Sequence, residues 1–96
     1  MATKRDVKKD ILFFIEEVLI DCMIFMELHP QQEHPEIEEI IDEMEILYSD
    51  LIFQVNHIDE EGKKNLKKYF DAIYMQLLDH VHHAFEKLAA VVEKSK

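Results

Sequence analysis

The sequence predicts an all-α fold: an up-down-up bundle of three helices with a long third helix, completed by dimerisation. Three observations support this prediction. One glycine and two prolines in 96 residues are too few for the many tight turns of a β-sandwich. Apolar residues recur at helical spacing in three segments, and short polar segments separate them. A chain of this length is expected to form a single domain, residues 1–96.

The first helix is expected over about residues 5–28. Thr3 and Asp6 have the spacing of a capping box, in which Asp takes the place of the usual Glu. His29 is expected to follow the last helical residue, because Pro30 disfavours the helical conformation in the residue before it. Apolar residues at helical spacing form a stripe along this helix, and further apolar residues extend the stripe almost around its whole circumference. More than one face of this helix should therefore be buried.

The second helix is expected over about residues 35–56. Pro35 suits the first turn of a helix, and Glu36, Glu38 and Glu39 would lie near the positive end of the helix dipole. The third helix is expected over about residues 60–93, with Asp59 as its N-cap, and the sequence leaves open whether it is continuous. Its apolar residues repeat with alternating spacings of four and three, as in a coiled coil.

The helix lengths predict that the third helix extends past the bundle. About 34 residues make a helix of roughly 50 Å, whereas about 22 residues, as in the first two helices, make roughly 33 Å. The last residues would then overhang and, together with the first helix, would bury their apolar side chains against a second copy or another protein. A bend or a frayed end of the third helix is the alternative. The expected self-association residues are Phe13, Ile20, Ile24, Phe85, Leu88 and Val92.

The charged residues are segregated along the chain. Between Asp10 and Glu61 there are sixteen Asp or Glu residues and no Lys or Arg, and the net charge is −10. This charge argues against binding to nucleic acids or to anionic membrane surfaces, and it suits a basic protein partner. A solvated face that keeps the protein in solution is the alternative. The expected partner-binding face of the second helix consists of Glu36, Glu38, Glu39, Asp42, Glu43 and Glu45.

The six histidines suggest a second hypothesis, a metal-binding or metal-sensing bundle. In the expected bundle, the linker between the first two helices lies beside the middle of the third helix, which would bring five histidines to one end. His at i and Asp or Glu at i ± 4 could share a metal ion. The candidate ligands are His29, His34, Asp79, His82, His83 and Glu86.

Few residues are suited to catalysis. The hydroxyl residues other than tyrosines are Thr3, Ser49 and Ser95, and none has a neighbouring His in a motif. The single Cys22 lies in an apolar run and is expected to be buried. We therefore expect no enzymatic activity and no cofactor. The first residues lack the apolar stretch of a signal peptide, and the most apolar segment, residues 11–26, holds three acidic residues, so we expect a cytoplasmic protein.

Overall fold

The computed structural model describes residues 3–95, and this part of the chain contains only helices and their connections. Three long helices, α1 (Lys4–Leu28), α2 (Pro35–Asn56) and α4 (Leu66–Lys94), make up most of it. A short helix, α3 (Glu60–Lys64), precedes α4. The molecule is elongated and measures 52 × 19 × 17 Å. None of the described helices is long and apolar enough to cross a membrane.

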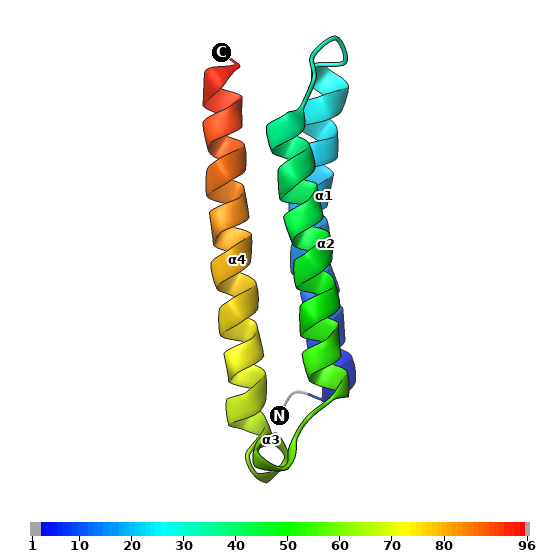
Figure 1. Ribbon diagram of the computed structural model, residues 1–96, viewed down its shortest axis with the longest axis vertical. Helices are drawn as coiled ribbons and strands as arrows, with labels where there is room; N and C mark the ends of the chain where they lie inside the picture. Colours follow the sequence, from blue (N-terminus) through cyan, green and yellow to red (C-terminus); the bar gives the residue numbers. More distant parts are fainter. Residues whose placement is uncertain (1–2, 96) are drawn as a thin grey trace.

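The three long helices lie side by side along the length of the molecule (Figure 1). Each of them packs against the other two. The loop between α1 and α2 lies at the same end as the C-terminus, and α3 lies at the opposite end near the start of α1 (Figure 1). Consequently α1 and α4 run in the same direction, and α2 runs in the opposite direction (Figure 1).

Local sequence signals set the ends of these helices. Thr3 and Asp6 form the predicted capping box: each backbone N–H donates to the other side chain, at 3.2 Å. These hydrogen bonds lower the pKa of the Asp6 carboxyl. Asp59 caps α3, where it accepts from the backbone N–H of Gly62 at 2.7 Å. Pro35 is the first residue of α2, as predicted, but the side chain of His34 at the N-cap makes no capping hydrogen bond.

The core is built from equal contributions of the three long helices. Burial of these apolar side chains is the main favourable contribution to folding, and no polar or charged residue of the described chain is buried. Cys22 is among the buried residues, and its burial raises the pKa of the thiol. The eighteen core residues are Val7, Ile11, Ile15, Val18, Cys22, Phe25, Ile37, Ile40, Met44, Leu47, Leu51, Val55, Phe70, Ile73, Leu77, Val81, Ala84 and Leu88.

The third helix expected over residues 60–93 is two helices in the structure, because the chain breaks at Asn65. This residue has φ −145° and ψ 78°, outside the helical region, and it ends α3 and caps α4. Its side-chain oxygen accepts from the backbone N–H of Lys68 at 3.1 Å. An asparagine side chain satisfies a backbone donor that a continuous helix would otherwise bond internally, which favours the break.

The predicted overhang of the third helix is also absent. The ammonium of Lys94, at the end of α4, lies 3.3 Å from a carboxylate oxygen of Glu36, at the start of α2. Leu88 is only 7% exposed, and Val91 packs partly buried against the core. Because of the break at Asn65, residues 60–64 form the separate helix α3 at one end of the bundle and do not extend α4. The end of α4 is therefore level with the α1–α2 loop (Figure 1).

Candidate interaction surfaces

The predicted acidic face of α2 divides into two parts. Glu43 accepts from the ammonium of Lys87 with both carboxylate oxygens, at 2.7 and 2.8 Å, and Glu36 pairs with Lys94. The hydrogen bonds to Glu43 raise the pKa of Lys87. These two carboxylates therefore join α2 to α4. The other four, here called the acidic ridge, are exposed and form no ion pair within residues 3–95: Glu38, Glu39, Asp42 and Glu45.

Two large apolar side chains share the outer face of α2 with the acidic ridge. Ile46 is 63% exposed and Phe53 is 60% exposed. Ile46 lines a shallow hollow together with Asp42 and Glu45 of the ridge. Since Ile46 and Asp42 are one helical turn apart, carboxylates and an apolar side chain occupy the same outer face of α2.

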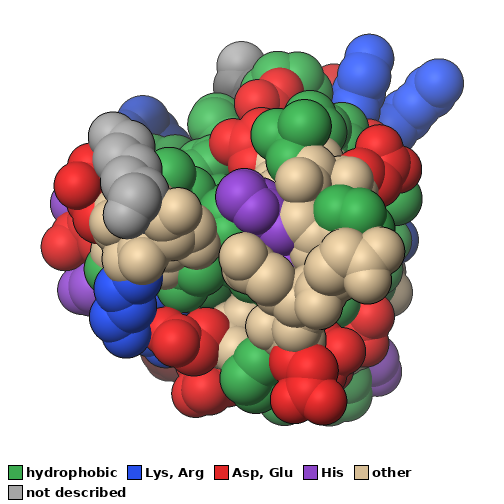
Figure 2. Space-filling model, turned by 90° about the horizontal axis from the view of Figure 1, so that it is seen from above, with side chains coloured by type: hydrophobic (Ala, Val, Ile, Leu, Met, Phe, Trp, Pro, Cys, Tyr) green, Lys and Arg blue, Asp and Glu red, His purple; other side chains and the backbone are tan. Residues whose placement is uncertain are grey.

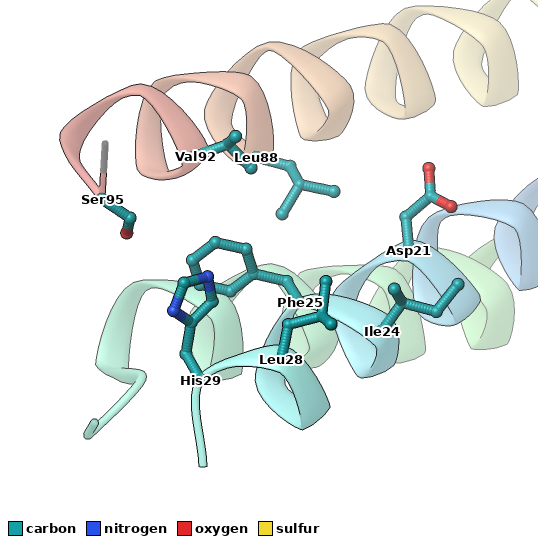
Figure 3. Close-up of a pocket in the computed structure, with 8 residues that line it drawn as sticks. All are labelled: Asp21, Ile24, Phe25, Leu28, His29, Leu88, Val92 and Ser95. Atoms are coloured by element: carbon teal, nitrogen blue, oxygen red, sulfur yellow. The ribbon is translucent and has the colours of Figure 1, made fainter. Parts of the chain in front are cut away.

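A second surface lies between α1 and α4. A hollow of about 400 Å³ opens at the end near the C-terminus, and its lining is mainly apolar (Figure 3). Phe25 and Leu88 are 7% exposed and form the buried part of the lining, whereas Ile24, Leu28 and Val92 are 48%, 71% and 37% exposed. Asp21, His29 and Ser95 complete the lining.

Exposed apolar residues continue from this hollow along α4. Leu78 and Phe85 precede Val92 by multiples of seven residues and share its side. On α1, Phe13 and Ile20 are 57% and 51% exposed, but each stands two residues from core residues on both sides, so both point away from the bundle and not toward α4. We call the hollow, together with Leu78 and Phe85, the α1–α4 groove.

Of the six residues expected to mediate self-association, four belong to this groove, namely Ile24, Phe85, Leu88 and Val92. Phe13 and Ile20 lie on the outer side of α1, and the six residues are not equally accessible. Phe13, Ile20, Ile24 and Val92 are exposed, whereas Phe85 is half-buried against the core. Leu88 lies in the core of its own chain. Leu28 and Leu78, which are 71% and 48% exposed, were not predicted as members of this surface. Their spacing from Ile24 and Phe85 was the signal that could have found them.

Two carboxylates lie on the same side of α1. Asp21 lines the hollow, and Glu17 precedes Asp21 by one helical turn and Ile24 by two. Both residues are exposed, and neither forms an ion pair with another described residue. The α1–α4 groove is thus apolar with an acidic edge, and sequence reasoning did not assign Glu17 or Asp21 to it.

The histidines do not gather at one end, contrary to expectation. His29 and His34 lie by the α1–α2 loop, where a ring nitrogen of His34 is 2.9 Å from the carbonyl oxygen of His29. His80 and His83 line a separate hollow between α2 and α4, together with Glu43. The break at Asn65 explains the difference, because it places the end of α4, and not its middle, beside this loop.

The candidate metal ligands form pairs and no larger set. His82 Nε2 lies 2.7 Å from Glu86 Oε1, and His83 Nδ1 lies 3.8 Å from Asp79 Oδ1. Within residues 3–95, no three His, Cys, Asp or Glu side chains come together as a metal site would require.

Figure 2, a view onto the end with the C-terminus, shows carboxylates at several places around the edge with hydrophobic side chains between them.

Comparison with known proteins gives no relative from which a role could be transferred: no family model, curated protein or solved structure matches this chain.

Proposed function

We propose that this protein is a non-enzymatic adaptor, in which an up-down-up bundle of three long helices presents the acidic ridge of α2 to a basic protein partner. The observation that carries this proposal is the state of the ridge: Glu38, Glu39, Asp42 and Glu45 have no ion pair within residues 3–95. Like charges at i+3 and i+4 in a helix cost about 0.2–0.5 kcal/mol per pair. Lys or Arg from a partner would remove this repulsion.

The position of Ile46 and Phe53 supports the same proposal. A partner that meets only carboxylates gains little, because exposed ion pairs contribute about 0.2–1 kcal/mol each. Two large side chains, each at least 60% exposed, add apolar area to the same face. A basic partner with apolar residues between its Lys and Arg side chains would use both.

The α1–α4 groove lies on the opposite side of the bundle from the outer face of α2, so an adaptor could bind two chains at once. A second copy of the protein, as the dimerisation hypothesis holds, is one candidate for the groove. The metal-binding hypothesis has no comparable support, since its candidate ligands form only pairs.

The proposal is tested by affinity capture from an extract of the native cells. The test variant carries Glu38→Gln, Asp42→Asn and Glu45→Gln. The control variant carries Glu16→Gln, Glu27→Gln and Glu33→Gln, which give the same net charge but lie outside the ridge. We expect the wild type and the control to retain a basic protein that the ridge variant loses, with capture weakening as salt rises. Equal capture by the two variants would contradict the proposal.

A further inference from the structure

We propose that the α1–α4 groove binds a basic amphipathic helix of a partner protein, which lies along α1 and α4 as a fourth helix. This inference extends the proposed adaptor function, since it assigns a ligand to the second surface. It rests on the groove's shape, its apolar lining and its unpaired carboxylates.

The shape of the groove suits a helix. Its apolar residues on α4 run from Leu78 to Val92, about four helical turns and roughly 21 Å. On α1, Ile24 and Leu28 line the hollow beside the end of this row. An amphipathic helix places apolar side chains on one face at i, i+3, i+4 and i+7, which suits this apolar row along α4. The hollow of about 400 Å³ beside Ile24, Leu28 and Val92 can take the largest of these side chains.

The charge of the groove indicates a basic partner. Glu17 and Asp21 are exposed, one helical turn apart, and each lacks an ion pair within residues 3–95. The chain has no Lys or Arg between Asp10 and Glu61, so α1 supplies no cation beside them. Lys or Arg on the polar edge of a docked helix would meet these carboxylates while its apolar face covers the groove.

A second copy is a poorer occupant, because either arrangement about a two-fold axis opposes like charges. If the copies ran antiparallel and covered the whole groove, Glu17 and Asp21 would lie near the same residues of the other copy. If they ran parallel, the two basic ends would meet. Each of those ends carries eight basic residues: Lys4, Arg5, Lys8, Lys9, Lys63, Lys64, Lys67 and Lys68.

The test uses two synthetic 18-residue amphipathic peptides with the same leucine face. One has lysine at its polar positions and the other has glutamate. We expect the leucine–lysine peptide to shift the amide NMR signals around Ile24, Leu28 and Val92, and the leucine–glutamate peptide to bind at least ten-fold more weakly. Equal binding of the two peptides, or no binding of either, would overturn the inference.

Matched variants locate the binding site. Ile24→Ser with Leu28→Ser, and separately Glu17→Gln with Asp21→Asn, should each weaken the leucine–lysine peptide at least ten-fold. All four positions are exposed, so the helix content measured by circular dichroism should not change. Ile46→Ser with Phe53→Ser, on the outer face of α2, is the control and should change the affinity less than three-fold.

The results separate this inference from the adaptor proposal. The leucine–lysine peptide could instead shift the NMR signals of Asp42 and Ile46 and lose its affinity in the Ile46→Ser, Phe53→Ser variant. That result would overturn the groove inference and would still support a basic partner at the acidic ridge. Light scattering of the free chain should give a monomer of 11.5 kDa. If the free chain is instead a dimer, and Ile24→Ser with Leu28→Ser converts it to a monomer, the groove binds a second copy and the inference is overturned.

Discussion

The hydroxyl of Tyr74 donates a hydrogen bond to the carboxylate of Asp10, which lies 64 residues earlier in the chain. Both side chains are half-buried, and the bond joins the first three turns of α4 to the first three turns of α1. Tyr74→Phe should therefore lower the free energy of unfolding by about 1–2 kcal/mol, since the change leaves the carboxylate without this donor. Urea unfolding measures the difference. Tyr48→Phe, for which the structure gives no hydroxyl hydrogen bond, is the control and should leave stability nearly unchanged.

The same contact predicts an unusual titration. Burial and the hydrogen bond to Asp10 raise the pKa of Tyr74 from 10.0 to about 12. Because the folded state favours the protonated phenol, this contribution to stability is complete below pH 10.0 and is lost as the pH rises through about 12. The absorbance of tyrosinate, followed against pH in the folded protein, should show one of the three tyrosines ionising last. Tyr74→Phe should remove that last step, and its persistence in the variant would refute the assignment.

Gly62 allows α3 to pack closely against the start of α4. A Cβ atom on Gly62 would lie 2.6 Å from Cδ2 of Tyr69 and 2.8 Å from Cγ2 of Ile58. Tyr69 cannot move away freely, because its hydroxyl donates to the backbone carbonyl of Gln54 at 2.7 Å. We expect Gly62→Ala to destabilise the protein by about 1–3 kcal/mol.

The test is whether Gly62→Ala lowers or raises the free energy of unfolding. Alanine is the better helix former by about 0.8–1 kcal/mol, so Gly62→Ala would stabilise the protein if the site were open. Thermal unfolding followed by circular dichroism distinguishes the two results. A variant more stable than the wild type would show that the close contact with Tyr69 does not limit this position.

The ends of α1 and α2 could be predicted because their signals are local. Thr3, Asp6 and Pro35 act within one helical turn, and both helices begin within a residue of the expected positions. The break at Asn65 was missed because the apolar spacing of the third helix continues through the following residues. An asparagine that caps Lys68 was a usable signal, but the regular spacing outweighed it.

The surfaces were harder to predict than the helices, because they depend on how far α4 is shifted along α2. That shift decides that Lys87 reaches Glu43 and Lys94 reaches Glu36, contacts that span 44 and 58 residues. It also decides that the middle of α4, with its histidines, lies far from the α1–α2 loop. Helical spacing alone assigned Phe13, Ile20 and Ile24 to one side of α1, since that property belongs to a single helix.

The division of the α2 carboxylates predicts opposite effects for two neighbouring substitutions. Asp42 lies one turn from Glu38 and from Glu45 and has no ion pair within the described chain, so Asp42→Asn relieves repulsion. We expect it to raise the free energy of unfolding by about 0.5–1 kcal/mol at low salt. Glu43→Gln removes an equal charge but also weakens the contact with Lys87 at 2.7 Å, so it should give no gain.

Urea unfolding of both variants in low and high salt checks this prediction. The advantage of Asp42→Asn should shrink at 1 M salt, where the screening length falls to about 3 Å and exposed charges interact weakly. Since the two substitutions change the net charge equally, a difference between them cannot come from the total charge of the protein. Equal stabilisation by both would mean that the chain gains nothing from the pair between Glu43 and Lys87. Asp42 and Glu43 would then be energetically alike, and the stability data would not distinguish the acidic ridge from the carboxylate that pairs with Lys87.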